Sequence, residues 1–314
     1  MPIQYSAEQP HYYSLSSCLK REFGERVHRV AVDAGFSCPH IEGAAADERM
    51  QGGCIYCADG ARAHYVEPTE PLAAQVRAGI KRVRGRFKAE KFLVYFQANT
   101  NTHAPVARLR ECYDAALSEQ NVVGLALGTR ADCLSDQVLD LLADYHRRTY
   151  LWLEIGLQSA NENFLQWMNR GHDLAAFIDA SRRAAKRGLR LCAHLMLGLP
   201  GERPEDALNA ARLIAELGYQ GLKLHMLYVS RRARLGRLYQ EKPFPLIDRE
   251  AYVAQVCDVL ERVPAEVVIH RLVSDCRAEE LIAPRWLLDK QATLSAIEAE
   301  FGRRGTCQGA ACTP

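Results

Sequence analysis

The chain has 314 residues, of which 48% are hydrophobic and 25% charged, and its formal net charge is +2 at pH 7. These values fit one large α/β domain or two small ones, and the charge balance does not by itself indicate nucleic acid or membrane as a partner. No stretch approaches the ~20 apolar residues of a membrane-spanning helix, and residues 1–13 lack the apolar core of a signal peptide. We therefore expect a cytoplasmic protein that does not enter the membrane.

Short apolar runs alternate with longer amphipathic segments through most of the chain. The predicted strands are 27–31, 92–97, 122–127, 151–157, 191–197 and 221–227, and the predicted helices are 71–86, 105–119, 135–146, 174–186 and 204–217. This alternation predicts βαβ units with a parallel sheet. Six units can form an open sheet or curl into a partial barrel, and in either case ligands bind at the carboxyl ends of the strands.

The pattern changes after Leu227. An arginine-rich segment, 230–237, is followed by a predicted helix at 249–263 and a strand at 267–270. The small residues of 302–314 predict a mobile tail. We divide the chain into a core with its N-terminal segment, 1–228, and a C-terminal extension, 229–314, that completes or covers the sheet.

Three of the eleven cysteines form the clearest candidate site. Cys38 follows the first predicted strand, and Cys54 and Cys57 form a Cys-x-x-Cys pair after two glycines. Three thiolates can hold a [4Fe–4S] cluster and leave its fourth iron open to a small molecule. Two other interpretations stay open: a zinc site completed by His40 or His64, and a dithiol that uses only Cys54 and Cys57.

The remaining cysteines are less informative. Most are scattered, and burial is the expected state of an isolated cysteine. Cys307 and Cys312 lie close together near the end of the chain and could form a bridge or bind a metal, but two ligands alone make a poor metal site.

Several blocks at the predicted strand ends carry a resemblance to a known family. Residues 35–39 and 52–57, together with later blocks in the same order, resemble the radical S-adenosylmethionine (SAM) superfamily, and more closely its YhcC-like branch, which is related to the elongator catalytic subunit. The resemblance extends from about residue 13 to about residue 286. The later blocks are 95–98, 128–133, 154–159, 169–172, 194–202 and 221–225. Two departures are clear: fifteen residues, 39–53, separate the first two cysteines where three are commonest, and the Gly-Gly-Glu stretch typical after the second strand is missing.

The resemblance implies a fold and a chemistry. The fold is a partial (β/α)6 TIM-like barrel with a short C-terminal extension. Cys38, Cys54 and Cys57 hold a [4Fe–4S] cluster that cleaves SAM to a 5′-deoxyadenosyl radical, which abstracts hydrogen from an unidentified substrate, small molecule or RNA. A flavodoxin or ferredoxin is expected as electron donor. Two alternatives remain: a tRNA-modifying enzyme of this kind, and a non-catalytic Fe–S or zinc protein.

Four polar positions are candidates for SAM contacts near the first strands. Gln97 and the loop 99–102 stand where the missing stretch would be, and this loop could equally satisfy its own backbone. Arg130 could bind a carboxylate and Asp132 ribose hydroxyls, or the two could pair with each other. Glu154 lies inside an apolar strand and needs a partner, either an arginine or a ligand.

Further candidates lie on the later strands. Gln158 and Arg170 fit the family's pattern for gripping SAM, with Arg170 facing the methionyl carboxylate. Leu197 and Leu199 are expected to form the wall beside the adenine. His194 and His225 lie on adjacent strands and are the candidates for contact with the substrate or for catalysis, although a lone strand histidine is more often a core residue.

Overall fold

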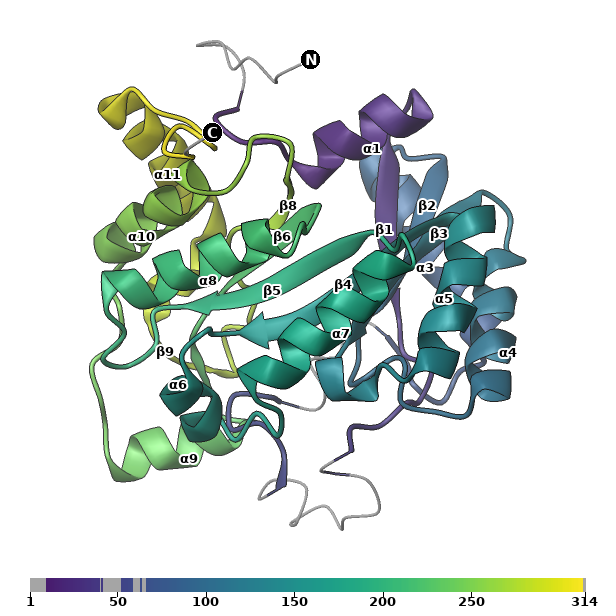
Figure 1. The fold of residues 1–314 in the computed structure, drawn as a ribbon, viewed down its shortest axis with the longest axis horizontal. Coiled ribbons are helices and arrows are strands. Elements are labelled where there is room, and N and C mark those ends of the chain that lie inside the picture. The colour runs from purple at the N-terminus through teal and green to yellow at the C-terminus, as the bar shows by residue number, and fades with distance from the viewer. Residues whose placement is uncertain (1–9, 40, 42–51, 59–62, 64–65, 313–314) are drawn as a thin grey trace.

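The computed structural model describes residues 10–39, 41, 52–58, 63 and 66–312, and its centre is one sheet of seven parallel strands (Figure 1). Their spatial order is β1-β2-β3-β4-β5-β6-β8. The six predicted strands are all present, and the predicted strand at 267–270 adds a seventh to the same sheet. The strands are β1 (Val27–Val32), β2 (Lys91–Phe96), β3 (Val122–Thr129), β4 (Tyr150–Gln158), β5 (Leu191–Leu197), β6 (Gly221–Met226) and β8 (Val268–Arg271).

The sheet is curled rather than open. The hydroxyl of Tyr95 on β2 lies 2.5 Å from Nζ of Lys223 on β6, although three strands separate these two in the sheet. Glu154 on β4 likewise lies 3.3 Å from His270 on β8. Side chains of distant strands therefore meet on the concave face, and the predicted partial barrel is confirmed.

The helices that follow the strands pack on the outer face of the sheet (Figure 1). Because the sheet also curls around its own inner face, most strand residues are buried on both faces, which explains their almost continuous apolar sequence. The outer core contains large, fully buried side chains such as Tyr113, Tyr145 and Phe177. The helices of this layer are α3 (Leu72–Phe87), α4 (Val106–Leu117), α5 (Asp136–Arg148), α7 (Leu174–Lys186), α8 (Pro204–Glu216) and α10 (Arg249–Glu261).

A helix that the apolar pattern did not predict, α1 (Leu15–Phe23), covers the inner face at one end of the strands. Ser14 caps its first turn by accepting from the Ser17 amide, and Gly24 ends it with a positive φ of 73°. Leu15 and Leu19 share an apolar cluster with Trp152 of β4. Figure 1 shows α1 at the end of the molecule opposite to α6 and α9, so the interior of the barrel has an apolar base at the α1 end.

The C-terminal part contains several further elements. They are β7 (Val229–Ser230), α9 (Arg234–Glu241), β9 (Leu281–Ala283) and α11 (Lys290–Arg304), and a short helix, α6 (Glu162–Trp167), lies earlier in the chain. Because β8 belongs to the main sheet, part of the predicted extension is built into the barrel. The division at residue 228 stays a prediction. No helix among the described residues is long and apolar enough to cross a membrane.

The tail beyond Gly302 was predicted to be mobile, and for its described part this prediction is wrong. The Gln308 side chain is buried, accepts from the Tyr13 amide at 2.9 Å, and donates to the carbonyls of Pro264 and Val267. A fully bonded amide anchors the tail to the start of the chain despite its small residues. Cys307 and Cys312 are free thiols.

Candidate active site at the cysteine loop

The three predicted cluster cysteines lie at the carboxyl ends of the strands and share one environment. Cys38 follows β1, and its sulfur lies 3.0 Å from Oγ1 of Thr100. Burial raises the pKa of the Cys38 thiol, and a charge on Cys54 raises it further, against the opposing effect of Thr100 and Arg130. Cys54 and Cys57 are joined by a tight turn in which the Cys57 amide donates to the Cys54 carbonyl at 3.0 Å.

The loop that carries Cys54 and Cys57 is held from two sides. Asn169, which adopts a left-handed backbone with φ of 51°, donates from Nδ2 to the carbonyls of Gly52 and Gly53, both at 2.9 Å. The Ile55 amide donates to the Met168 carbonyl at 3.0 Å, and the Ile55 carbonyl accepts from Leu235 of α9 at 2.7 Å. The segment after α6 and the start of α9 therefore fix the position of the two thiols.

Arg170 places a cation directly against this loop. Its Nη1 lies 3.7 Å from the Cys54 sulfur and its Nη2 donates to the Gly156 carbonyl at 3.0 Å. The residue is 6% exposed, and its Nε is buried without a hydrogen-bond partner among the described residues. A guanidinium in this position stabilises thiolate charge.

Gly156 makes room for this arrangement. A Cβ at this position would lie 2.5 Å from Nη2 of Arg170 and 2.7 Å from Nε2 of Gln158. Gln158 is buried and has a φ of 72°, at an irregularity in the pairing of β4 with β5. The two residues predicted to grip SAM are thus brought together over one glycine of β4.

Arg130 and Asp132 pair with each other. Nε and Nη2 of Arg130 donate to the two carboxylate oxygens of Asp132 at 2.9 and 2.7 Å, and Nη1 donates to the Arg170 carbonyl at 2.8 Å. Burial alone would raise the pKa of Asp132, but the bonds from Arg130 outweigh it and lower that pKa. This is the second of the two interpretations given for the pair, and contact with SAM stays a prediction.

A polar layer lies on the concave face of the sheet, with Glu154 at its centre. Glu154 is fully buried, and its Oε2 accepts from Lys223 Nζ at 2.7 Å and lies 2.8 Å from His194 Nε2. Its Oε1 lies 3.3 Å from His270 Nδ1 and 3.8 Å from Arg29 Nη1. The predicted partner of Glu154 was an arginine or a ligand. An arginine, Arg29, does lie within ion-pair distance, but the principal partner is a lysine two strands away, which was not predicted.

The ionisation of this layer follows from its burial. Burial alone would raise the pKa of Glu154, but Lys223 and His194 outweigh it and hold that pKa well below its usual range. Burial lowers the pKa of Lys223 to about 8 and that of His194 to about 3. At neutral pH the layer therefore contains an ionised Glu154, a charged Lys223 and a neutral His194.

The two candidate histidines lie next to each other above this carboxylate. The ring centroids of His194 and His225 are 5.0 Å apart. Burial and the neighbouring Arg271, whose guanidinium lies against the His225 ring, hold the pKa of His225 well below its usual range. The prediction that the two histidines lie on adjacent strands of one barrel is confirmed, and their catalytic role stays a prediction.

Comparison with known proteins connects this site to a family. The profile described as the Radical SAM superfamily matches residues 51–214, and the profile of the Radical_SAM C-terminal domain matches residues 219–303. YtqA of Bacillus subtilis is 37% identical over 98% of this chain and 95% of its own length, and YhcC of Escherichia coli is 35% identical over 93% of each. This chain belongs to the radical SAM superfamily.

The superfamily membership makes the protein a radical SAM enzyme, and the relation to the YhcC-like branch is confirmed. Radical SAM enzymes in general use SAM with a [4Fe–4S] cluster and need an electron donor. Elp3 of the archaeon Methanocaldococcus infernus has the same fold, with a TM-score of 0.66 at 17% identity over 90% of this chain and 64% of that one. Methylornithine synthase superposes with a TM-score of 0.51 at 11% identity over 93% of this chain and 86% of that one.

The other predicted SAM contacts of this radical SAM enzyme have clear structural roles of their own. Asn99 donates to the Phe36 carbonyl at 2.8 Å, and Asn101 donates to the Phe96 and Gly128 carbonyls, both at 2.9 Å. The loop 99–102 thus supports the segment that carries Cys38. Gln97 is half-buried beside it, and its contact with SAM stays a prediction.

Leu197 and Leu199 are buried on either side of a turn at the end of β5. Gly198 has a φ of 77°, and the amides of Gly198 and Leu199 donate to Oε2 of Glu202 at 2.8 and 3.2 Å. Leu199 packs in one apolar cluster with Ile55 of the cysteine loop. This packing brings the turn close to the cysteines, while the predicted adenine wall is untested.

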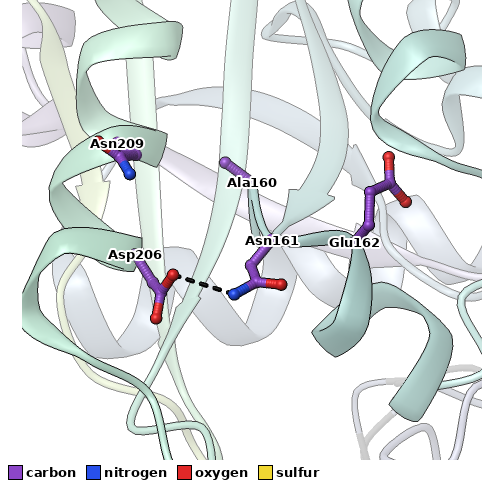
Figure 2. Close-up of a pocket in the computed structure, with 5 residues that line it drawn as sticks. All are labelled: Ala160, Asn161, Glu162, Asp206 and Asn209. Atoms are coloured by element: carbon purple, nitrogen blue, oxygen red, sulfur yellow. Dashed lines mark hydrogen bonds between the residues drawn. The ribbon is translucent and has the colours of Figure 1, made fainter.

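Neither the zinc interpretation nor the surface pockets add to this site. His40 and His64, the candidate fourth zinc ligands, lie outside the described residues. Within the described ranges, no group of three or more His, Cys, Asp and Glu side chains is arranged to hold one metal ion, and this includes Cys38, Cys54 and Cys57. In a [4Fe–4S] cluster each cysteine binds a different iron, so this finding concerns a single ion such as zinc. A pocket of about 280 Å³ lies between the starts of α6 and α8 (Figure 2). Asn161 donates to Asp206 there at 3.0 Å, and no predicted site residue lines the pocket.

Several residues of the site were not found from the sequence. Lys223 carried a usable signal, because it is charged within an apolar strand and lies two residues before His225, on the same face. Asn169 directly precedes a predicted SAM residue but gave no indication that it binds the cysteine loop. Tyr95, His270 and Arg271 join the layer only because the sheet curls.

Proposed function

We propose that Cys38, Cys54 and Cys57 hold a [4Fe–4S] cluster with one open iron, and that SAM binds this iron. The observation that carries the proposal is the position of Arg170, a buried cation 3.7 Å from the Cys54 sulfur in a loop fixed by Asn169 and α9. When bound, the cluster supplies the electron that cleaves SAM to methionine and a 5′-deoxyadenosyl radical, which takes hydrogen from the substrate.

The chain's own residues fit this group. The free Nε of Arg170 is a buried donor without a partner among the described residues, and a carboxylate such as that of methionine would satisfy it. Gln158 lies beside the same guanidinium and offers a second polar contact. Leu197 and Leu199, in the buried turn behind the loop, exclude water from one side, as a reactive radical requires.

His194 and His225 are proposed to face the substrate. The His194 side chain is 13% exposed, and its Nε2 is fixed by Glu154, so the ring is oriented before a substrate binds. Its low pKa keeps it neutral at physiological pH, because burial and Lys223 disfavour the imidazolium. A neutral imidazole whose Nε2 is held by Glu154 can position a polar group of the substrate by a hydrogen bond to its other ring nitrogen.

The test is the product of SAM cleavage. The protein is reconstituted with iron and sulfide without oxygen, reduced with dithionite and supplied with SAM, and 5′-deoxyadenosine is measured by liquid chromatography. We expect 5′-deoxyadenosine from the wild type and from Cys18→Ala, a control thiol on α1 at the other end of the barrel, and none from Cys54→Ala. A wild-type protein that contains about four irons per chain but makes no 5′-deoxyadenosine overturns the proposal.

We further propose, as a second candidate, that the substrate is RNA. The arginine-rich segment 230–237 has exposed side chains at Arg231, Arg232 and Arg237, and α9 contacts the cysteine loop through Leu235. Two more distant relatives are the tRNA uridine(34) acetyltransferase of Dehalococcoides mccartyi, 24% identical over 54% of this chain, and Elongator complex protein 3 of Schizosaccharomyces pombe, 26% identical over 76%. The match spans 40% and 50% of those two proteins, so their activities are only a guide.

The RNA candidate is tested by the salt dependence of tRNA binding. Phosphate contacts make the logarithm of affinity fall linearly with the logarithm of salt concentration. We expect Arg231→Gln and Arg237→Gln each to weaken binding and to reduce this slope, while Arg182→Gln on the outer helix α7 leaves both unchanged. Binding without salt dependence rejects RNA as substrate.

For the electron donor, a cytoplasmic flavodoxin or ferredoxin is the candidate.

A further inference from the structure

The polar layer contains more positive than negative charge. Its ionised groups among the described residues are one carboxylate, Glu154, and three cations: Lys223, Arg29 and Arg271. Arg271 and Arg29 both lie close enough to Lys223 to disfavour its charged form. Buried charges normally occur in balanced pairs, because uncompensated charge is costly away from water.

Glu154 cannot neutralise all three cations. Lys223 and His194 occupy its Oε2, and His270 lies 3.3 Å from its Oε1. Arg29 approaches Oε1 only to 3.8 Å, beyond hydrogen-bond distance, and its Nη1 is buried without a hydrogen-bond partner among the described residues. The carboxylate thus accepts from Lys223 and lies against two histidines, while Nη1 of the guanidinium beside it has no hydrogen bond in the described part of the chain.

Arg271 is paired even less well. Its Nη2 lies against the ring of His225, which is neutral, and its Nε is buried without a hydrogen-bond partner in the described part of the chain. A guanidinium prefers a planar, two-oxygen partner, and neither His225 nor His194 offers one. Solvent reaches the layer, since the side chains of Arg29 and His194 are 27% and 13% exposed.

We infer that the concave face of the barrel binds an oxyanion of the substrate, a carboxylate or a phosphate, at Arg271 beside His194 and His225, where Arg29 of the same layer adds to the positive charge. Such a group would satisfy the buried Nε of Arg271 and would offset the excess positive charge of the layer. The inference rests on the proposed function only in making the bound molecule the substrate. The oxyanion site itself follows from the residues of the layer.

The experiment measures oxyanion binding directly. Reconstituted protein in low-salt buffer without SAM is dialysed to equilibrium against radiolabelled inorganic phosphate and, separately, against radiolabelled acetate, and unlabelled acetate is then added to the phosphate sample as a competing carboxylate. We expect saturable binding of phosphate, acetate or both to the wild type and to Arg182→Gln. In Arg271→Gln the affinity should fall about 10- to 100-fold, which is the effect of losing a hydrogen bond to a charged group. In Arg29→Gln, which removes a positive charge of the layer, the affinity should fall by less.

Each outcome either decides whether the bound oxyanion is a carboxylate or a phosphate, or rejects the site. Strong competition by acetate assigns a carboxylate, and weak competition assigns a phosphate. A wild type that binds neither ion, or variants that bind as the wild type does, overturns the inference. If Arg271→Gln does not fold, as judged by circular dichroism, Arg271→Lys keeps the charge, loses the planar fork and should bind with intermediate affinity.

Cleavage of SAM, the proposed function, is measured separately in the same protein preparation. 5′-Deoxyadenosine from wild-type protein that binds no oxyanion rejects the inference alone. Oxyanion binding by protein that forms no 5′-deoxyadenosine leaves the oxyanion site in place and rejects the proposed cleavage of SAM.

Discussion

The ion pair between Lys223 and Glu154 provides the sharpest test of the interior of the barrel. In Lys223→Met the side chain keeps its approximate length, but the fully buried Glu154 loses the cation that lies 2.7 Å from its Oε2. The nearest remaining charge is Arg29 at 3.8 Å, because His194 and His270 are neutral at pH 7. Removing one partner of a buried ion pair costs about 3–5 kcal/mol.

The assay is urea unfolding of the cluster-free protein at pH 7, followed by circular dichroism, so that loss of metal does not distort the transition. We expect a lower midpoint for Lys223→Met, with a free energy of unfolding reduced by about 3–5 kcal/mol. The exposed control Lys81→Met should stay within about 0.5 kcal/mol of the wild type.

The double variant Lys223→Met with Glu154→Gln separates the pair from its surroundings. Because both charges are then absent, its destabilisation should be smaller than the sum of the two single effects, with a coupling of about 0.5–3 kcal/mol. Strict additivity, or a Lys223→Met protein as stable as the wild type, would refute the assignment of Lys223 as the main partner of Glu154.

Three further predictions concern the cysteine loop. Gly156→Ala should leave the unfolding midpoint nearly unchanged but slow SAM cleavage by up to about 10²-fold, because its Cβ would displace the Arg170 guanidinium; an unchanged rate would contradict this. Asn169→Gly keeps the left-handed backbone but loses the bonds to Gly52 and Gly53, so iron bound per chain should fall, and full iron content would show that these bonds are dispensable. Burial and Arg170 lower the pKa of His172 to about 4. As the pH falls below about 6.5, the His172 imidazole is therefore protonated in the unfolded chain before it is protonated in the folded protein. The wild type should lose stability from this site between about pH 6.5 and 4, and His172→Gln should show a shallower slope in urea unfolding at each pH.

The sequence was most informative where local chemistry decides the structure. The apolar runs fixed the strands to within about two residues because strands buried on both faces must be continuously apolar. Ser135, the first residue of the predicted helix 135–146, is of a type that caps helices, and its hydroxyl accepts from the Val138 amide at 3.3 Å. Gly188 and Gly218 follow the predicted helices 174–186 and 204–217, and both have the positive φ typical of a glycine that ends a helix, 71° and 70°.

Long-range packing was less accessible. Whether six βα units stay open or curl depends on side chains such as Tyr95 and Lys223, which are 128 residues apart and carry no mutual sequence signal. The same curling brings His270 to Glu154. The tail was mispredicted because composition favours mobility, whereas one buried amide, Gln308, anchors it.

In the candidate site, too, some features could be predicted from the sequence and others depended on long-range packing. The resemblance correctly indicated the family. It also named Arg170 and Gln158 as a pair of SAM contacts, and the structure places both side chains beside Gly156 of β4. It did not indicate that Arg130 and Asp132 pair with each other, because either partner could equally have faced a ligand. The excess charge of the concave face became visible only when residues of six strands were placed in one layer.

The central claim is that Cys38, Cys54 and Cys57 hold a cluster whose open iron binds SAM. The most direct test is electron paramagnetic resonance of the reduced, reconstituted protein with and without SAM. The wild type and Cys18→Ala should give a reduced [4Fe–4S] signal that changes when SAM is added, and Cys38→Ala, Cys54→Ala and Cys57→Ala should each lose it. A wild-type signal that SAM does not change, or a full signal in any of the three variants, would contradict the claim.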